Sequence, residues 1–191
     1  MRRLFLIALL CFLPLTARAV THTVGPPGTG MDFTSMTTCF AALGNGDVVE
    51  SYGPHSESNQ EITSGLGGAV TGVTWRHYGA DYAFDGNGGT ATFFVLGAGN
   101  TGWDIDVNNG DGRVVMTGYI GANPLVITGA SNTVGGFRMT ANGAAGVAQV
   151  TAILTGNSSE FHDLLIDNPV DPGNQSWIGF YLNGGSGNIV S

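Results

Sequence analysis

The chain has 191 residues and is acidic, with 14 Asp and Glu residues against 6 arginines, no lysine and a formal net charge of −8. This charge repels the phosphate backbone of DNA and RNA, so the composition excludes nucleic acid as an expected partner. Glycine contributes 32 residues that are spread along the chain, more than twice its usual share of about 7%, and this disfavours long helices.

The segment Met1–Ala19 has the order of a secretory signal peptide. Arg2 and Arg3 precede the apolar run Leu4–Leu13, and the segment ends in Ala-Arg-Ala, a small-x-small cleavage signal. The run is shorter than the roughly 20 apolar residues of a transmembrane helix. We therefore expect cleavage after Ala19 and a secreted, periplasmic or cell-surface protein without a transmembrane segment. The alternative is an uncleaved N-terminal anchor.

The mature chain would keep few cations and one thiol. Its arginines are Arg76, Arg113 and Arg138, and its single cysteine is Cys39. One cysteine cannot form an internal disulfide, so packing and backbone pairing must stabilise the exported domain. Cys39 lies in an apolar stretch and is expected to be a buried structural thiol.

Residues 20–46 are predicted to form an N-terminal strand and a capping helix. Phe33, Met36, Phe40 and Leu43 recur at helical spacing within residues 32–43. An Asp or Thr cap is expected at the start, and the Gly-Asn-Gly sequence of residues 44–46 at the end. The helix is expected to cover the open first coil of the domain that follows.

Residues 47–191 alternate short β-branched and aromatic runs with Gly, Asn and Asp, which indicates strands separated by turns. With no helical segment of useful length between the runs, a βαβ layout is excluded. The predicted strands are Asp47–Gly53, Gly72–Gly79, Ala91–Gly97, Trp103–Val107, Arg113–Tyr119, Leu125–Gly129, Gly136–Thr140, Val150–Gly156, Phe161–Asp167 and Ile178–Asn183.

The second half of the chain repeats itself. Leu125–Asn132 aligns with Ala152–Ser159 and then with Phe180–Gly187. The offsets are about 27 and then about 28 residues, a period typical of solenoids. Each period would form one coil that stacks on the next at about 4.8 Å. At the same offsets Phe137 matches Leu164 and Phe161 matches Ile189. The alignment also predicts a ladder of turn residues through Asn132, Ser159 and Gly187.

The N-terminal motifs carry a family resemblance. Gly28-x-Gly30-x-Asp32-Phe33-Thr34-Ser35 is followed by the short helix and by Gly46–Gly53, and Ile62–Trp75 has the form of a next coil. This arrangement resembles the entrance to right-handed parallel β-helix proteins of the pectate-lyase-like superfamily. The resemblance implies an all-β, right-handed parallel β-helix with a short N-terminal capping helix. The superfamily contains polysaccharide lyases, glycoside hydrolases, epimerases, phage tailspikes and adhesins, so the motifs indicate a fold and not a reaction.

Relatives of this type usually continue for several more coils. We therefore expect residues 47–191 to be an incomplete set of coils, interrupted at Ser191. The uncapped last coil of such a fragment would self-associate through its unpaired edge.

The resemblance implies how a lyase of this fold would work. Clustered carboxylates would bind Ca²⁺, and an arginine or lysine would remove a proton from the substrate uronate. Because the chain has no lysine, the candidate bases are the arginines Arg76, Arg113 and Arg138, with a histidine as the alternative. Arg138 should point outward if its neighbours Phe137 and Met139 point inward. The alternative is that each arginine pairs with a surface carboxylate.

Asp104, Asp106, Asn108 and Asp111 form the candidate calcium site. The two residues Asp104 and Asp106 should share one strand face, with the other two in the following turn. The spacing departs from a calcium loop, because the glycine is displaced and Val115 stands where the closing Glu is expected. An ordinary Asn/Gly turn is the alternative.

A second acidic group comprises Glu160, Asp163, Asp167 and Asp171, with His162 nearby. These carboxylates are candidates for a hydrolytic pair, or are solvated turn residues. His55 and His77 lie in early coils, and their spacing does not suggest a metal triad. The aromatic residues are either packing residues or flat platforms for sugar rings. They are Trp75, Trp103, Trp177, Tyr52, Tyr78 and Tyr181.

These observations predict an extracellular role, in either a catalytic or a non-catalytic protein. We expect an exported β-helix protein that binds or acts on extracellular polysaccharide, in its catalytic form a calcium-assisted polysaccharide lyase. The other form is a non-catalytic surface adhesin or structural solenoid, which the scarcity of cations favours.

Overall fold

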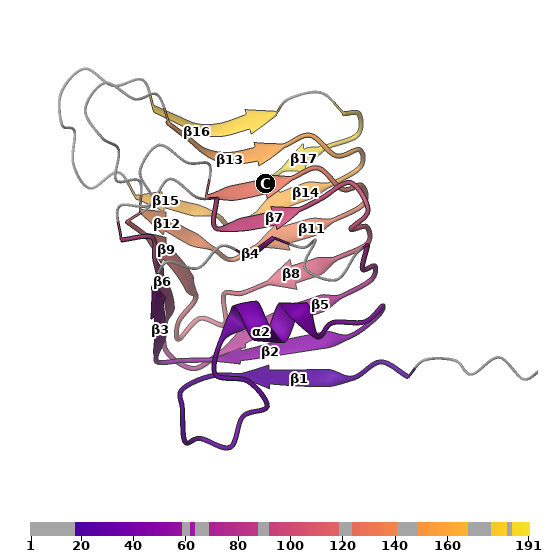
Figure 1. The fold of residues 1–191 in the computed structure, drawn as a ribbon. Helices are drawn as coiled ribbons and strands as arrows, with labels where there is room; N and C mark the ends of the chain where they lie inside the picture. Colours follow the sequence, from indigo (N-terminus) through magenta and orange to yellow (C-terminus); the bar gives the residue numbers. More distant parts are fainter. Residues whose placement is uncertain are drawn as a thin grey trace, which may run out of the picture.

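The structure is a computed structural model that describes residues 18–58, 62–63, 69–87, 92–118, 124–140, 149–167, 177–182 and 185–191. Within these ranges the chain forms one helix and seventeen strands, which pair in parallel and wind as a β-solenoid (Figure 1). The predicted all-β parallel β-helix with one short helix is confirmed. The predicted signal peptide lies outside the described residues apart from its last two positions.

The strands form three sheets, one along each side of the solenoid. The first sheet contains β1 (Thr21–Val24), β2 (Val48–Tyr52), β5 (Thr74–Tyr78), β8 (Asp104–Asp106), β11 (Thr133–Gly135), β14 (Glu160–His162) and β17 (Ile189–Val190). The second contains β3 (His55–Ser58), β6 (Tyr82–Asp85), β9 (Val114–Thr117), β12 (Arg138–Thr140) and β15 (Leu165–Asp167). The third contains β4 (Ile62–Thr63), β7 (Phe94–Leu96), β10 (Leu125–Ile127), β13 (Gln149–Leu154) and β16 (Trp177–Leu182).

The strand register confirms the repeat in the second half of the chain. Leu125–Ile127 pairs with Ala152–Leu154, which in turn pairs with Phe180–Leu182. The predicted match of Phe161 with Ile189 is wrong by one position, because Phe161 pairs with Val190. The turn between β16 and β17 holds one residue more than the turn between β13 and β14, and this shifts the register.

Helix α2 (Met36–Ala41) is shorter than the predicted 32–43. Phe33 forms a parallel bridge with Val24, and the Asp32 carboxylate accepts hydrogen bonds from the backbone N–H and the hydroxyl of Thr23. The predicted Asp or Thr cap is therefore wrong, because Asp32 already holds the preceding loop and Ser35, at the N-cap, makes no side-chain cap.

A distant carboxylate satisfies the N-terminus of α2. Glu57 Oε1 accepts hydrogen bonds from the Met36 N–H, at 2.8 Å, and from the Tyr82 hydroxyl. On the buried face of the helix, Phe40 packs edge-on against Trp75, with ring centroids 5.2 Å apart, and Cys39 is fully buried, as predicted. The helix thus covers the end of the aromatic core at the first coils (Figure 1).

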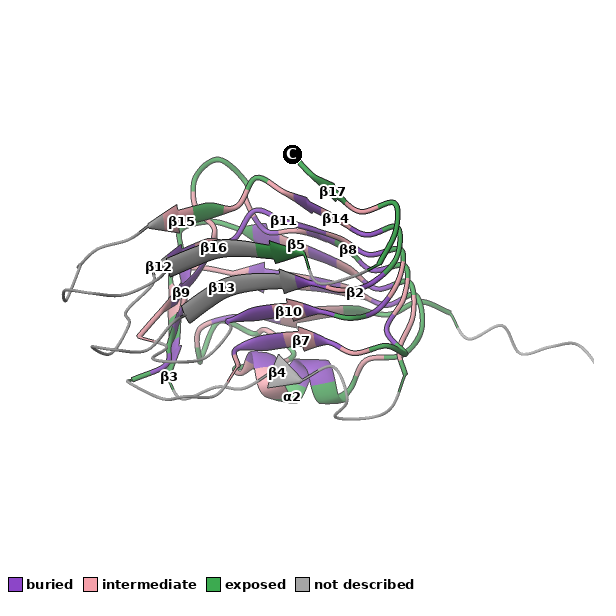
Figure 2. Ribbon diagram, turned by 90° about the horizontal axis from the view of Figure 1, so that it is seen from above, coloured by how far each residue is buried: buried purple, intermediate pink, exposed green. Residues whose placement is uncertain are grey.

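Apolar residues that alternate along the strands fill the interior. Figure 2 shows buried segments along the strands, and exposed residues mainly in the turns and on the last strands. Burying one large apolar side chain contributes about 1.5–3 kcal/mol, so the stacked rings are the main stabilising feature. The largest side chains of this core are Trp75, Trp103, Tyr82, Phe84, Phe93, Phe94, Phe137 and Phe161.

A polar ladder runs along the turn that precedes the first sheet. The side-chain oxygen of Asn132 accepts from Trp103 N–H at 2.9 Å, Ser159 Oγ accepts from Asn132 N–H at 3.1 Å, and Asn188 Oδ1 accepts from Ser159 N–H at 3.0 Å. The predicted ladder is confirmed for Asn132 and Ser159. Asn188 takes the position predicted for Gly187, owing to the same extra residue before β17.

At the other end of the solenoid, β16 and β17 are edge strands. Both expose apolar side chains, among them Leu182 and Ile189. Self-association through this end stays a prediction. Within the described ranges, no helix has the length and apolar character needed to cross a membrane.

Candidate functional site

Strand β8 is joined to β9 by a hairpin, residues 107–113. The other connections from the first to the second sheet are short turns, so this hairpin is an insertion between two strands of one coil. Val114 N–H donates to the Val107 carbonyl, and Asn108 forms an antiparallel bridge with Arg113. At the tip, Asn109 Oδ1 accepts from the N–H groups of residues 111 and 112, each at 2.8 Å. The Asn/Gly turn considered as the alternative to a calcium loop is therefore present.

The hairpin is packed tightly on the coil beneath it. Asn109 Nδ2 donates to the Gly79 carbonyl at 3.1 Å, and Arg113 N–H donates to Asp81 Oδ1 at 3.0 Å. Gly112 lies so close to Gly79 and to the backbone of residues 80–81 that a Cβ there would overlap them. These contacts fix the position of the hairpin relative to the sheets.

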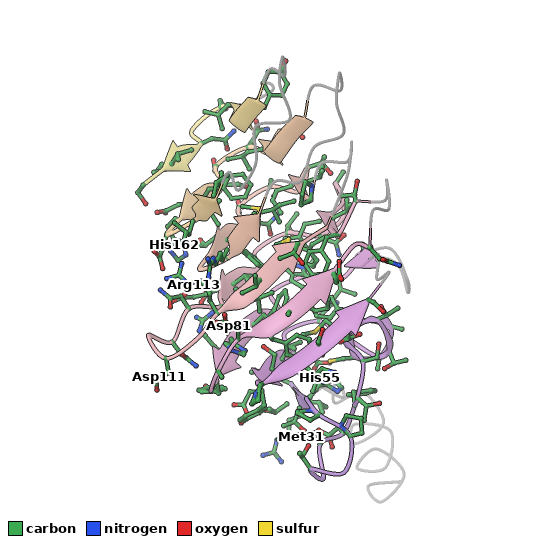
Figure 3. The ribbon with its side chains drawn as sticks, turned by 90° about the vertical axis from the view of Figure 1, so that its left-hand side faces the viewer. Met31, His55, Asp81, Asp111, Arg113 and His162 are labelled. Atoms are coloured by element: carbon green, nitrogen blue, oxygen red, sulfur yellow. The ribbon has the colours of Figure 1, made fainter. Side chains whose placement is uncertain are left out.

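The hairpin forms one wall of a pocket of about 220 Å³. Two of the three candidate arginines come together here, Arg113 from the hairpin and Arg138 from β12. Figure 3 shows Asp81, Asp111 and Arg113 along one border of the molecule. The residues that line the pocket are Asp81, Asn108, Gly110, Asp111, Gly112, Arg113, Arg138 and Leu165.

The orientation predicted for Arg138 is confirmed. Its neighbours Phe137 and Met139 are buried, and Arg138 itself is only partly buried. The alternation of the strand therefore directs the guanidinium away from the core and toward the pocket.

Arg76, the third candidate, does not line the pocket. It pairs with Asp104 on the adjacent strand, with Arg76 Nη2 2.5 Å from Asp104 Oδ2 and Nη1 2.9 Å from the Asp104 carbonyl. The side chains are 33% and 53% exposed, so solvent screens this ion pair, and its contribution to stability is at most about 1 kcal/mol.

The candidate calcium residues do not share one set of contacts in the structure. Asp104 and Asp106 share the outward face of β8, as predicted, but Asp104 pairs with Arg76 and Asp106 accepts from Asn108 N–H at 3.4 Å. Asp111 lies on the pocket wall. In the described part of the chain, no three His, Cys, Asp or Glu side chains gather as a metal site would require, so we derive no role for Ca²⁺ from this geometry.

One residue of the second acidic group, Asp163, contacts the hairpin. Asp163 Oδ2 accepts a hydrogen bond of 2.6 Å from Asn108 Nδ2, across 55 residues of sequence. Glu160 accepts from the Ser191 hydroxyl at 3.1 Å. Asp171 and the side chain of Asp167 lie outside the described residues.

His162 lies over a glycine of the preceding coil. Gly135 pairs with both Asp106 and His162, and a Cβ on Gly135 would overlap the imidazole ring. Gly135 does not have a positive φ, so the close approach of the ring accounts for glycine at this strand position. Figure 3 places His162 on the same border as Arg113 and Asp81.

The two early histidines serve the scaffold. His55 Nε2 lies 3.2 Å from the Thr34 carbonyl, near the start of α2. His77 Nε2 lies 2.8 Å from the Ala80 carbonyl and His77 Nδ1 lies 3.1 Å from Ser51 Oγ. Burial lowers the pKa of His77. Ser51 and His77 are both buried, so this serine and histidine cannot reach a substrate and do not form a nucleophilic dyad.

The candidate sugar platforms divide by burial. Trp75 and Trp103 belong to the core, whereas Tyr78 is 41% exposed and Tyr181 is 43% exposed. Tyr78 stacks on Tyr52, with ring centroids 5.3 Å apart and an interplanar angle of 25°. The side chain of Trp177 lies outside the described residues.

Comparisons of the chain with protein-family models, with curated proteins and with solved structures found no match.

Proposed function

We propose that the protein is an exported β-helix protein that binds an extracellular polysaccharide carrying carboxylate groups. The observation that carries the proposal is the position of Arg113 and Arg138, which line the same pocket in an otherwise acidic chain. Guanidinium groups bind carboxylates through paired hydrogen bonds, and two of them in one pocket suit an anionic sugar.

The other polar groups of the pocket support a sugar ligand. Asp81 and Asp111 have carboxylates that can accept hydrogen bonds from hydroxyl groups, and Leu165 supplies an apolar surface. Mixed linings of this kind suit a ligand with hydroxyl groups, an anionic group and apolar C–H faces. The order of charged, apolar and small residues in Met1–Ala19 supports the extracellular setting.

Lyase activity is the catalytic form of this proposal. Arg113 and Arg138 are then the candidate bases for removing the proton next to the uronate carboxylate. The measurement is the absorbance of the unsaturated product from a uronate polymer, with calcium and then with a chelator. Product that appears only in the presence of calcium would also support the predicted metal requirement.

A non-catalytic adhesin or structural solenoid is the second candidate. The scarcity of cations favours it, because the single described arginine on the outward face of the first sheet, Arg76, is paired with Asp104. Binding of a uronate polymer without any product would select this form. Retention of no glycan at all on a glycan array would contradict both forms.

Calorimetric titration of uronate oligomers tests the binding site. Arg113→Gln and Arg138→Gln should each weaken binding by about tenfold or more, since a charged hydrogen bond contributes about 1.5–3 kcal/mol. Arg76→Gln is the matched control, because it removes an arginine that lies outside the pocket. Equal losses in all three variants, or equal wild-type binding of a neutral glucose oligomer, would contradict the proposed site.

A further inference from the structure

Two exposed apolar side chains lie near the pocket. In the described part of the chain, the large exposed apolar residues are Val20, Tyr78, Leu165, Tyr181, Leu182, Ile189 and Val190. Val20 lies just before β1, and the last four lie on the edge strands β16 and β17. The remaining two are Leu165, which lines the pocket, and Tyr78, which ends β5.

Tyr78 keeps an exposed surface although Tyr52 covers one side of its ring. Tyr52, its partner in register on β2, stacks against one side of the ring. Strand β8 lies on the other side of β5 and leads into the hairpin. Tyr78 thus combines a 41% exposed ring with a place at the end of β5, the strand next to the one that leads into the hairpin.

The contacts of the hairpin keep Tyr78 and the pocket adjacent. The residue after Tyr78 is Gly79, whose carbonyl accepts the hydrogen bond from Asn109, and Gly112 packs against the same turn. Asp81, two residues further, lines the pocket. Tyr78 and Asp81 belong to one coil and the hairpin to the next, at the usual coil spacing of about 4.8 Å.

The stacked pair is held in place before any ligand binds. The Tyr52 hydroxyl donates to Glu50 Oε2 at 2.9 Å. Burial, together with this carboxylate, raises the pKa of Tyr52 to about 12, so the hydroxyl remains a donor at neutral pH. A fixed aromatic surface loses little side-chain entropy when a ligand packs on it.

We propose that Tyr78, supported by Tyr52, is a stacking subsite for a second sugar ring of the saccharide whose carboxylate occupies the Arg113–Arg138 pocket. The flat ring packs against the apolar C–H face of a pyranose, and the pocket binds the charged group of the neighbouring unit. This inference rests on the proposed function and adds to it a requirement for an oligosaccharide instead of a single sugar.

Titration of uronate oligomers of increasing length tests the subsite. The variants are Tyr78→Ala, Tyr78→Phe, and Tyr181→Ala as a control that removes a tyrosine of nearly equal exposure from another sheet. Tyr78→Ala should weaken binding of the longer oligomers by about five- to tenfold and leave binding of the monomer within about twofold of wild type. Tyr78→Phe should bind like wild type, and melting curves of the three variants should match.

The outcomes separate this inference from the proposed function. If the wild-type protein binds oligomers and loses binding with Arg138→Gln, but Tyr78→Ala binds like Tyr181→Ala, the pocket stands and the stacking subsite is overturned. If monomer and oligomers lose affinity equally in Tyr78→Ala, the ring does not contact a second sugar and the inference is also overturned. If wild type binds no uronate saccharide, both the proposed function and this subsite fail.

Discussion

Replacing Asn132 by alanine is expected to destabilise the protein by about 2–6 kcal/mol, because it removes two hydrogen bonds between the Asn132 side chain and buried backbone groups, and the loss of each costs about 1–3 kcal/mol. Asn132 is 1% exposed, accepts from Trp103 N–H at 2.9 Å and donates to the Asn100 carbonyl at 2.9 Å. Urea unfolding followed by circular dichroism measures the change as a shift of the midpoint to lower urea.

Serine at the same position is the informative comparison. One coil further on, Ser159 Oγ already accepts from Asn132 N–H and donates to the Gly129 carbonyl at 3.1 Å. The single hydroxyl of Ser159 thus accepts from one backbone N–H and donates to one backbone carbonyl, as the amide of Asn132 does one coil below. Asn132→Ser should therefore recover more than half of the stability that Asn132→Ala loses. Equal destabilisation by the two variants, or a loss for alanine no larger than that of an ordinary surface substitution, would refute the ladder as a source of stability.

The destabilisation caused by replacing a glycine with alanine should depend on which atoms the new Cβ contacts. In Gly135→Ala the new methyl group meets the movable imidazole of His162, so the free energy of unfolding should fall by about 1–2 kcal/mol and the histidine signal should shift in NMR spectra. In Gly156→Ala it meets the carbonyl oxygen of Gly129, and the loss in the same unfolding assay should exceed about 3 kcal/mol. Similar losses in the two variants would contradict these contacts. Burial lowers the pKa of His77 below its ordinary 6.5, so the unfolded chain takes up this proton first as the pH falls. The free energy of unfolding should then decrease from about pH 6.5 downward, and His77→Gln should flatten the dependence between about pH 7 and 5; unchanged slopes would show that His77 does not titrate in this way.

The strands and their stacking can be predicted from the sequence because two regularities coincide. Alternating apolar residues indicate each strand, and the offset that aligns Leu125 with Ala152 in the sequence is also their register in the structure. A single extra residue before β17 is enough to displace the prediction for Phe161. Offsets read from similar segments do not reveal a change in turn length, since glycine-rich turns tolerate additional residues.

The candidate site is only partly predictable, because its residues lie far apart in the chain. The absence of lysine points to the arginines, yet their meeting in one pocket depends on a hairpin that projects from a turn. The contact between Asn108 and Asp163 spans two coils, and no local motif indicates it. A useful signal is present for other pairs: Arg76 and Asp104, or Ser51 and His77, are separated by about one coil length and meet in the structure.

In the proposed function, the hairpin of residues 107–113 separates ligand binding from the packing that stabilises the coils. Above and below it, the parallel ladders continue from β5 through β8 to β11 and from β6 through β9 to β12. The aromatic core lies inside these ladders, whereas Asn108, Asp111 and Arg113 project from the inserted segment. Different residues at its exposed positions, such as Asp111, could therefore alter the pocket while the coils stay in register. Under the proposed function, the ligand preference of the pocket can thus change without a change in the strand pairing of the coils.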